Sequence, residues 1–156
     1  MNGMAEFKLN YKNKYSIDVK GEKDPETAED FEPLAAGIAT VEPSFEEETD
    51  DTAYYDGGGM GSLDVTGLNT SLSFSGHRVN GDKAQDYIVG LAFKTGEERK
   101  TSLKWERADG KTIKGTVTIS EITPTGGDAN AKETFECTIT FDGQPIVEEA
   151  GGGGGS

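Results

Sequence analysis

Cysteine is nearly absent from this sequence, since Cys137 is the only one in 156 residues. A single thiol excludes an internal disulfide framework and a zinc site built on several cysteines. Cys137 itself is expected to be a small core residue. No apolar run approaches the ~20 residues that a bilayer-spanning helix needs, and Met1 to Lys8 has no apolar segment of the signal-peptide type. We therefore expect no membrane partner and a protein that is made in a cytoplasm.

Apolar side chains are also scarce, at 33% of the sequence, while glycine occurs 22 times. A chain of this length provides one domain with a core and is too short for two ordinary ones. We expect a single domain over residues 1–150, with a modest β-rich body and long polar loops. Residues 151–156, five glycines and a serine, are expected to be a flexible tail or linker.

Basic residues are missing from one long part of the chain. The net charge is −14, and residues 21–56 contain 13 acidic residues against one lysine, Lys23. Such a segment repels phosphate, which excludes sequence-specific nucleic-acid binding as a function. An acidic run is usually a solvated loop, and we expect one over Gly21 to Glu32.

Alternating apolar and polar residues predict several half-buried strands. The clearest is Thr134 to Phe141, and a hairpin is expected from Thr101 to Ile119 around the turn at Ala108-Asp109-Gly110. Phe7 to Val19 predicts one strand or two short ones, and Pro33 to Phe45 a weaker strand. Leu63 to Gly76 predicts a strand in which the apolar residues change from odd to even positions at Thr66-Gly67. A bulge there would keep them on one side of the sheet.

Only one helix is indicated, which begins after Asp82 as its N-cap and is expected to end at Gly96. Its apolar stripe recurs at three- and four-residue spacing and consists of Ala84, Tyr87, Ile88, Leu91 and Ala92. The expected fold class is therefore mainly β: a β-sandwich or curved antiparallel sheets with one short flanking α-helix. Several strands must lie at sheet edges, and such edges need partners.

A long aperiodic loop is predicted from Glu46 to Ser62, an unusual length for a compact domain and a sign of function or disorder. Its acidic start, tyrosine pair and glycine run comprise Glu46, Glu47, Glu48, Asp50, Asp51, Tyr54, Tyr55, Gly57, Gly58, Gly59 and Met60. The glycine run lacks the lysine of a phosphate-binding loop. The acidic start lacks the ligand spacing and central glycine of a calcium loop. We expect neither a cofactor nor a metal.

No catalytic constellation is evident. Ser75, His77 and Asp82 can be written as a triad, but no nucleophile-elbow or oxyanion signature surrounds them. The only tryptophan, Trp105, lies in an alternating strand and is expected to pack in the core or at an interface. An enzyme is therefore the least favoured of three hypotheses, after a structural subunit and a non-catalytic binding module.

Four segments, in this order, resemble the major tail-tube proteins of siphophages, especially those of Gram-positive hosts. The segments are YYDGGGMGSLDVTG (54–67), LSFSGHRVNGDKAQDYI (72–88), RADGKTIKGTVTI (107–119) and TFECTITFDGQPI (134–146). The similarity covers about residues 5–147. It implies a β-sandwich subunit that stacks in hexameric rings as a hollow tube, with the loop Glu46 to Ser62 reaching from one ring to the next and ordering on assembly.

The resemblance also implies partners and a location. The partners are further copies of the chain, a tape-measure protein, tail terminator and tail-tip proteins, and genomic DNA that passes without sequence-specific binding. The location is the virion tail, assembled in the host bacterial cytoplasm. The alternative is a binding module, such as a virion decoration, baseplate or carbohydrate-binding protein, and the sequence leaves open whether the tail is contractile.

Overall fold

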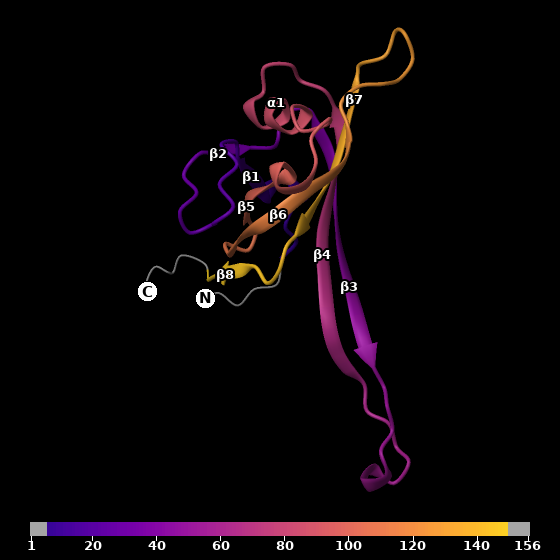
Figure 1. Ribbon diagram of the computed structural model, residues 1–156. Coiled ribbons are helices and arrows are strands. Elements are labelled where there is room, and N and C mark those ends of the chain that lie inside the picture. The colour runs from indigo at the N-terminus through magenta and orange to yellow at the C-terminus, as the bar shows by residue number, and fades with distance from the viewer. Residues whose placement is uncertain (1–5, 150–156) are drawn as a thin grey trace.

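A single antiparallel sheet forms both the body of the protein and a long projecting arm (Figure 1). The computed structural model describes residues 6–149. Its strands run in the order β2-β1-β5-β6-β7-β4-β3, and β8 also pairs with β6. The bounds are β1 Lys14–Asp18, β2 Phe31–Pro33, β3 Ile38–Asp50, β4 Asp64–His77, β5 Lys100–Glu106, β6 Thr112–Thr123, β7 Thr134–Phe141 and β8 Ile146–Glu148. The mainly-β class with one flanking α-helix is confirmed, in the form of one curved sheet.

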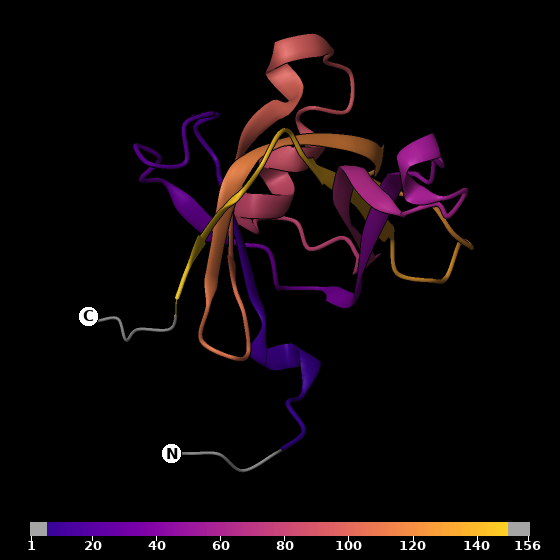
Figure 2. The same ribbon diagram turned by 90° about the horizontal axis from the view of Figure 1, so that it is seen from below.

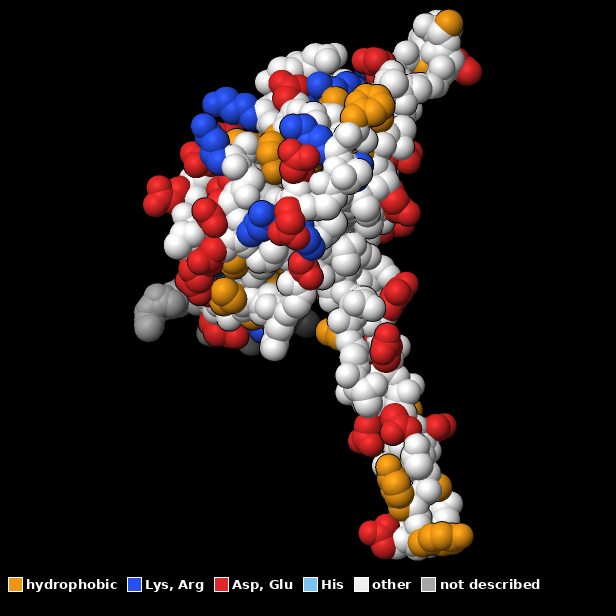
Figure 3. Space-filling view, viewed as in Figure 1, with side chains coloured by type: hydrophobic (Ala, Val, Ile, Leu, Met, Phe, Trp, Pro, Cys, Tyr) orange, Lys and Arg blue, Asp and Glu red, His pale blue; other side chains and the backbone are white. Residues whose placement is uncertain are grey.

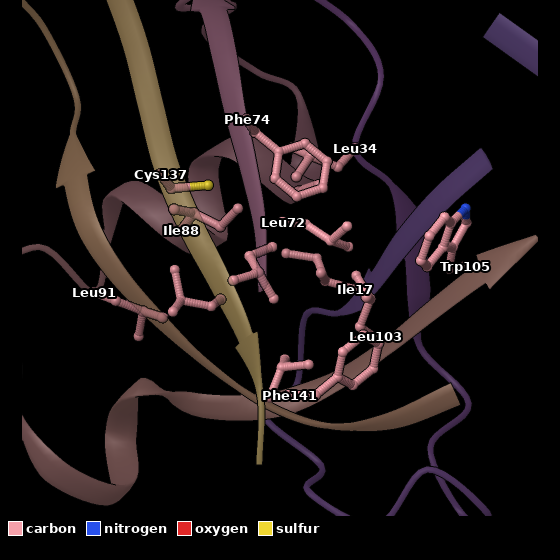
Figure 4. Packing of buried hydrophobic residues seen from close by; sticks show 14 of the residues in the cluster. Ile17, Leu34, Leu72, Phe74, Ile88, Leu91, Leu103, Trp105, Cys137 and Phe141 are labelled. Atoms are coloured by element: carbon pink, nitrogen blue, oxygen red, sulfur yellow. The ribbon is translucent and has the colours of Figure 1, made fainter. Parts of the chain in front are cut away.

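The sheet curls so that its distant strands face one another. Tyr15 of β1 meets Phe74 of β4 edge to face, with ring centroids 5.2 Å apart, although three strands separate them in the sheet order. The core fills the space between, and Figure 4 shows Leu72, Phe74 and Cys137 pointing toward Ile17 and Leu103. Cys137 and Trp105 are buried as predicted.

The strands with regular alternation lie where the sequence predicts them. β7 matches its predicted bounds, and its odd-numbered residues from Phe135 to Phe141 are buried. β5 and β6 form the predicted hairpin, with Glu106 opposite Thr112. The predicted bulge is also present: Glu48 pairs with Gly67 and Thr49 with Val65, which leaves Thr66 as the extra residue.

The helix begins as predicted and ends earlier. α1 spans Lys83–Val89, and the Asp82 carboxylate caps it by accepting a hydrogen bond from the Gln85 amide at 3.1 Å. The prediction that Gly96 ends the helix is wrong, because the chain leaves the helix at Gly90 and Gly96 opens the 3₁₀ helix η3, Gly96–Arg99. Leu91 is still buried, since the turn after the helix stays on the sheet.

A buried glutamine that the apolar pattern does not reveal fixes the helix to the sheet. Gln85 is fully buried. Its side-chain oxygen accepts from the Val79 amide at 2.8 Å, and its nitrogen donates to the carbonyl oxygens of Ala36 and His77 at 2.9 and 3.1 Å. A buried amide with its polar groups satisfied ties three segments together.

The N-terminal strand is shorter than predicted. Only Lys14–Asp18 is β-strand, and the residues before it form the 3₁₀ helix η1, Asn10–Lys12. The apolar members of the predicted alternation, Phe7, Leu9 and Tyr11, are exposed by 101%, 60% and 70%. Alternation alone mispredicts here because no second element within residues 6–149 covers that face. The weak strand predicted for residues 33–45 is also divided, between β2 and the first part of β3.

The acidic loop predicted for Gly21 to Glu32 is a loop as far as Asp30, and its last two residues belong to β2. The side chain of Asp18 organises it. The Asp18 carboxylate is fully buried and accepts hydrogen bonds from the amides of Lys20, Glu22 and Asp30 at 2.8, 3.2 and 3.1 Å. The loop then lies over β5 and β6, where Ser102 and Thr116 donate to the carbonyl oxygens of Glu22 and Lys23. This loop therefore covers one part of the outer sheet face.

Candidate assembly surfaces

The most distinctive surface is the arm, which we define as residues 45–70. It consists of the outer parts of β3 and β4 and the tip that joins them. β4 pairs with β7 only as far as Ser71 opposite Thr140. Beyond that point β3 and β4 pair with each other alone, out to Asp50 opposite Asp64, and the arm projects away from the body (Figure 1). A lone two-stranded hairpin is marginally stable in water, and no other strand in residues 6–149 pairs with this part of β3 and β4.

The start of β3 and the end of β4 cross closely in the body, at the opposite end of these strands from the arm. A Cβ atom on Gly76 would lie 2.0 Å from the carbonyl oxygen of Gly37, and one on Gly37 would lie 2.4 Å from that of His77. Gly37 also adopts a φ of 76°, a left-handed conformation that favours glycine. The two glycines therefore allow the start of β3 and the end of β4 to approach closely in the body.

The tip of the arm, residues 51–63, is apolar and acidic at once. A bridge between Ala53 and Gly61 closes it around the 3₁₀ helix η2, Tyr55–Gly57. Tyr55 and Met60 are exposed by 105% and 77%, and Figure 3 shows hydrophobic side chains gathered at the far end of the arm. Just before the tip, hydrogen bonds from the Thr52 hydroxyl and amide hold the pKa of Asp50 below its usual range. This carboxylate therefore stays charged at neutral pH.

The structure divides the predicted loop into strand and tip. Glu46, Glu47, Glu48 and Asp50 belong to β3, so the prediction of a loop from Glu46 is wrong by five residues. These strand residues show no alternating burial because both faces of the arm are exposed. The rest of the predicted set lies in the tip: Asp51, Tyr54, Tyr55, Gly57, Gly58, Gly59 and Met60.

The predicted helix residues lie elsewhere. Ala84, Ile88 and Leu91 are buried in the core, Tyr87 packs against it, and Asp82 caps the helix. In Figure 1 α1 lies at the opposite end of the molecule from the tip of the arm. The two predicted sets therefore do not form one site.

A second surface is the outer face of β3, β4 and β7. These strands contain no lysine or arginine. Across them, hydroxyls and carboxylates stand in register, with Glu42 opposite Ser73 and Ser73 opposite Thr138. The face comprises Thr40, Glu42, Ser44, Ser71, Ser73, Ser75, Glu136, Thr138 and Thr140. It is polar and acidic, whereas Figure 3 shows the lysine and arginine side chains gathered on the body.

A third surface, which the sequence does not indicate, is a groove between η1, β1 and the root of β3. It encloses about 670 Å³. Trp105 stacks on Tyr15 with centroids 5.6 Å apart, and the Arg107 guanidinium lies 5.3 Å from the Trp105 ring centroid. Burial raises the pKa of the Tyr15 hydroxyl. The lining also includes Tyr11, Lys14, Leu34, Ala35, Val41, Pro43 and Phe45.

No catalytic or metal chemistry is assembled among residues 6–149. The Asp82 carboxylate of the hypothetical triad is engaged as the helix cap, and His77 is exposed at the end of β4. No group of three or more His, Cys, Asp or Glu side chains in the described part of the chain is placed to hold a metal ion. No helix within these residues is long and apolar enough to span a membrane.

A curved β-rich body, a projecting arm and broad uncovered surfaces define a subunit built to associate. The sequence profile of the phage tail tube proteins matches residues 17–147, and the chain belongs to this family. A search of curated proteins gives no match.

Solved tail structures share the fold. A chain from the tail of an empty gene transfer agent particle, refined with C6 symmetry, superposes with a TM-score of 0.74 at 18% identity, over 92% of this chain and 100% of that one. A chain from the virion of a native gene transfer agent particle gives 0.71 at 18% identity with the same coverage. The tube-terminating cap of the anti-feeding prophage gives 0.63 at 12% identity, over 96% of each chain.

Proposed function

We propose that this protein is the structural subunit of a phage tail tube, a non-enzymatic protein that assembles as stacked hexameric rings and forms the conduit for DNA ejection. Family membership supports the tube, and the C6 symmetry of the similar tail supports the hexamer. The observation that carries the proposal is the arm, a two-stranded projection whose apolar tip is left exposed by the rest of residues 6–149. The Gram-positive siphophage type stays a prediction.

The outer face of β3, β4 and β7 is the surface best suited to the lumen. Contacts between phosphates and cationic side chains supply most of the affinity of non-specific DNA binding. A wall of hydroxyls with Glu42 and Glu136, and with no lysine or arginine on its three strands, removes that attraction. DNA and a tape-measure protein would then pass without being held.

The arm is proposed as the contact between rings. From Phe45 to Asp50 its strand extends about 20 Å at ~3.3 Å per residue, and the tip lies farther from the body (Figure 1). In the view from below, the arm is seen nearly end-on beside the body (Figure 2). Its exposed tyrosines and Met60 are the residue types that protein interfaces favour. Copies at the two ends of the tube would present the same surfaces to tail-tip and terminator proteins. The assembled tube belongs in the virion tail, after assembly in the host cytoplasm.

Electron microscopy of the purified protein tests this function. Hollow rods are expected in negative stain as the protein concentration rises, alone or with a tail-tip complex as nucleus. A matched variant replaces residues 51–63 by Asn-Gly, which closes a hairpin between the paired residues Asp50 and Asp64. It should keep the circular dichroism spectrum and lose the rods. Monomers at all concentrations, even with the nucleus present, would refute the proposal.

A further inference from the structure

The groove between η1, β1 and the arm root has no occupant within residues 6–149. Its floor is aromatic and aliphatic, and its only charged lining residues are Lys14 and Arg107. Two cations without a lining carboxylate are unusual on a chain of net charge −14. Arg107 has an ion pair with Asp109 at 3.8 Å, while both side chains stay about half exposed. The groove thus presents an apolar base with a cationic rim.

The tip of the arm has the complementary composition. It offers Tyr54, Tyr55 and Met60, all well exposed, and it is flanked or interrupted by Asp50, Asp51, Asp56 and Asp64. No lysine or arginine occurs anywhere from Asp24 to His77. Aromatic burial supplies the binding free energy of such a contact, and opposite charge supplies orientation and partner choice. Two tips repel each other, so tip-to-tip pairing is disfavoured.

The tip that fits this groove must come from another copy. Pro43 and Phe45 line the groove at the arm root, and the arm leads away from them as paired strands (Figure 1). Folding the tip back would break the pairs from Phe45–Thr70 to Asp50–Asp64. The exposed N-terminal segment is a poorer occupant, because residues 6–12 contain Lys8 and Lys12 against Glu6 alone, which gives no attraction to a cationic rim.

We propose that the groove is the acceptor site for the arm tip of a second copy, with Tyr54, Tyr55 and Met60 against the aromatic floor and the tip aspartates near Lys14 and Arg107. The inference rests on the proposed tube function and adds the acceptor surface to it. The groove volume of about 670 Å³ falls within the range of ~300–1,000 Å³ typical of occupied sites.

Cross-linking between differently labelled copies tests the contact. Tyr55→Cys protein is mixed with Ala35→Cys protein, assembled and oxidised; Ala35 is an exposed lining residue of the groove. The native Cys137 is buried with its pKa raised to about 12 and stays unreactive. The matched control replaces Ala35→Cys by Phe93→Cys, fully exposed and outside the groove. Disulfide-linked pairs are expected with Ala35→Cys and at background with Phe93→Cys.

The outcomes separate the two proposals. Rods that form without the Tyr55–Ala35 link would overturn the acceptor site and leave the tube function standing. Rods with equal linking at both positions would overturn it as well. No rods in any mixture or from the wild-type protein, even with the tail-tip nucleus present, would overturn the tube function and the acceptor site with it.

Charge reversal gives an independent readout. Lys14→Glu should raise the protein concentration needed for half-assembly about fivefold, since an exposed attraction becomes a repulsion. Lys14→Arg should leave the half-assembly concentration unchanged. Adding Asp51→Lys and Asp56→Lys to the Lys14→Glu chain should lower that concentration again in part. A Lys14→Glu protein that assembles as the wild type does, with the same circular dichroism spectrum, would contradict the proposed rim.

Discussion

The Gly76→Ala substitution is the sharpest test of how the arm is fixed to the body. The new methyl group would lie 2.0 Å from the Gly37 carbonyl oxygen and 2.8 Å from the Ala39 amide nitrogen. Both contacts are with backbone, so neither neighbour can rotate away. The start of β3, around Ile38, must therefore move. Overpacking of this kind destabilises by about 1–3 kcal/mol. For a domain of this size that lowers Tm by roughly 2–10 °C, and the displaced arm should assemble poorly.

Gly67→Ala on the same strand is the matched control. There the added methyl group would lie 3.4 Å from the Glu48 side chain, an ordinary contact at the bulge on the exposed arm. Thermal unfolding followed by circular dichroism measures both variants, and negative stain measures rods. Gly76→Ala with the Tm and rods of wild type would refute the close crossing as a contact that fixes β3 against β4.

Three further predictions concern the body. Asp18→Ala should destabilise by about 2–4 kcal/mol in urea unfolding, because three backbone amides lose their buried acceptor; exposed Asp30→Ala should change little. The Arg78 hydrogen bond at 2.7 Å holds the pKa of Asp86 below its usual range. The stability that Asp86 contributes is therefore present above about pH 4 and lost as the pH falls through the lowered pKa. The difference in unfolding free energy between wild type and Asp86→Asn should vanish in acid. Because burial raises the pKa of Cys137 to about 12, a thiol reagent should label it only after denaturation.

Sequence patterns predicted the parts of the fold in which the chain buries its own residues. In β7, Phe135 and Ile139 pack on the core while Thr138 faces outward, so burial within the chain and alternation in the sequence coincide. The N-cap at Asp82 and the bulge at Thr66 were predictable because each depends on local chemistry.

The remainder depends on contacts that the pattern does not encode. Gln85 is a polar residue at a buried helical position. It bonds the nearby residues His77, Arg78 and Val79 and, across the fold, the distant carbonyl oxygen of Ala36. The groove joins residues of η1, β1, β3 and the end of β5, so only the folded topology reveals it. β8 is three residues long and too short to show a period.

Two of the incorrect sequence predictions share a physical cause. Phe7, Leu9 and Tyr11 alternate as a buried strand would, yet they are exposed. Residues 46–50 lack alternation, yet they are strand. In both places the usual link between periodicity and burial fails because the isolated chain has no second surface to cover these side chains. A protein that completes its contacts in an assembly exposes side chains whose sequence pattern and burial disagree. Here such residues lie beside the groove, as Tyr11 does, and along the arm next to its tip, as residues 46–50 do.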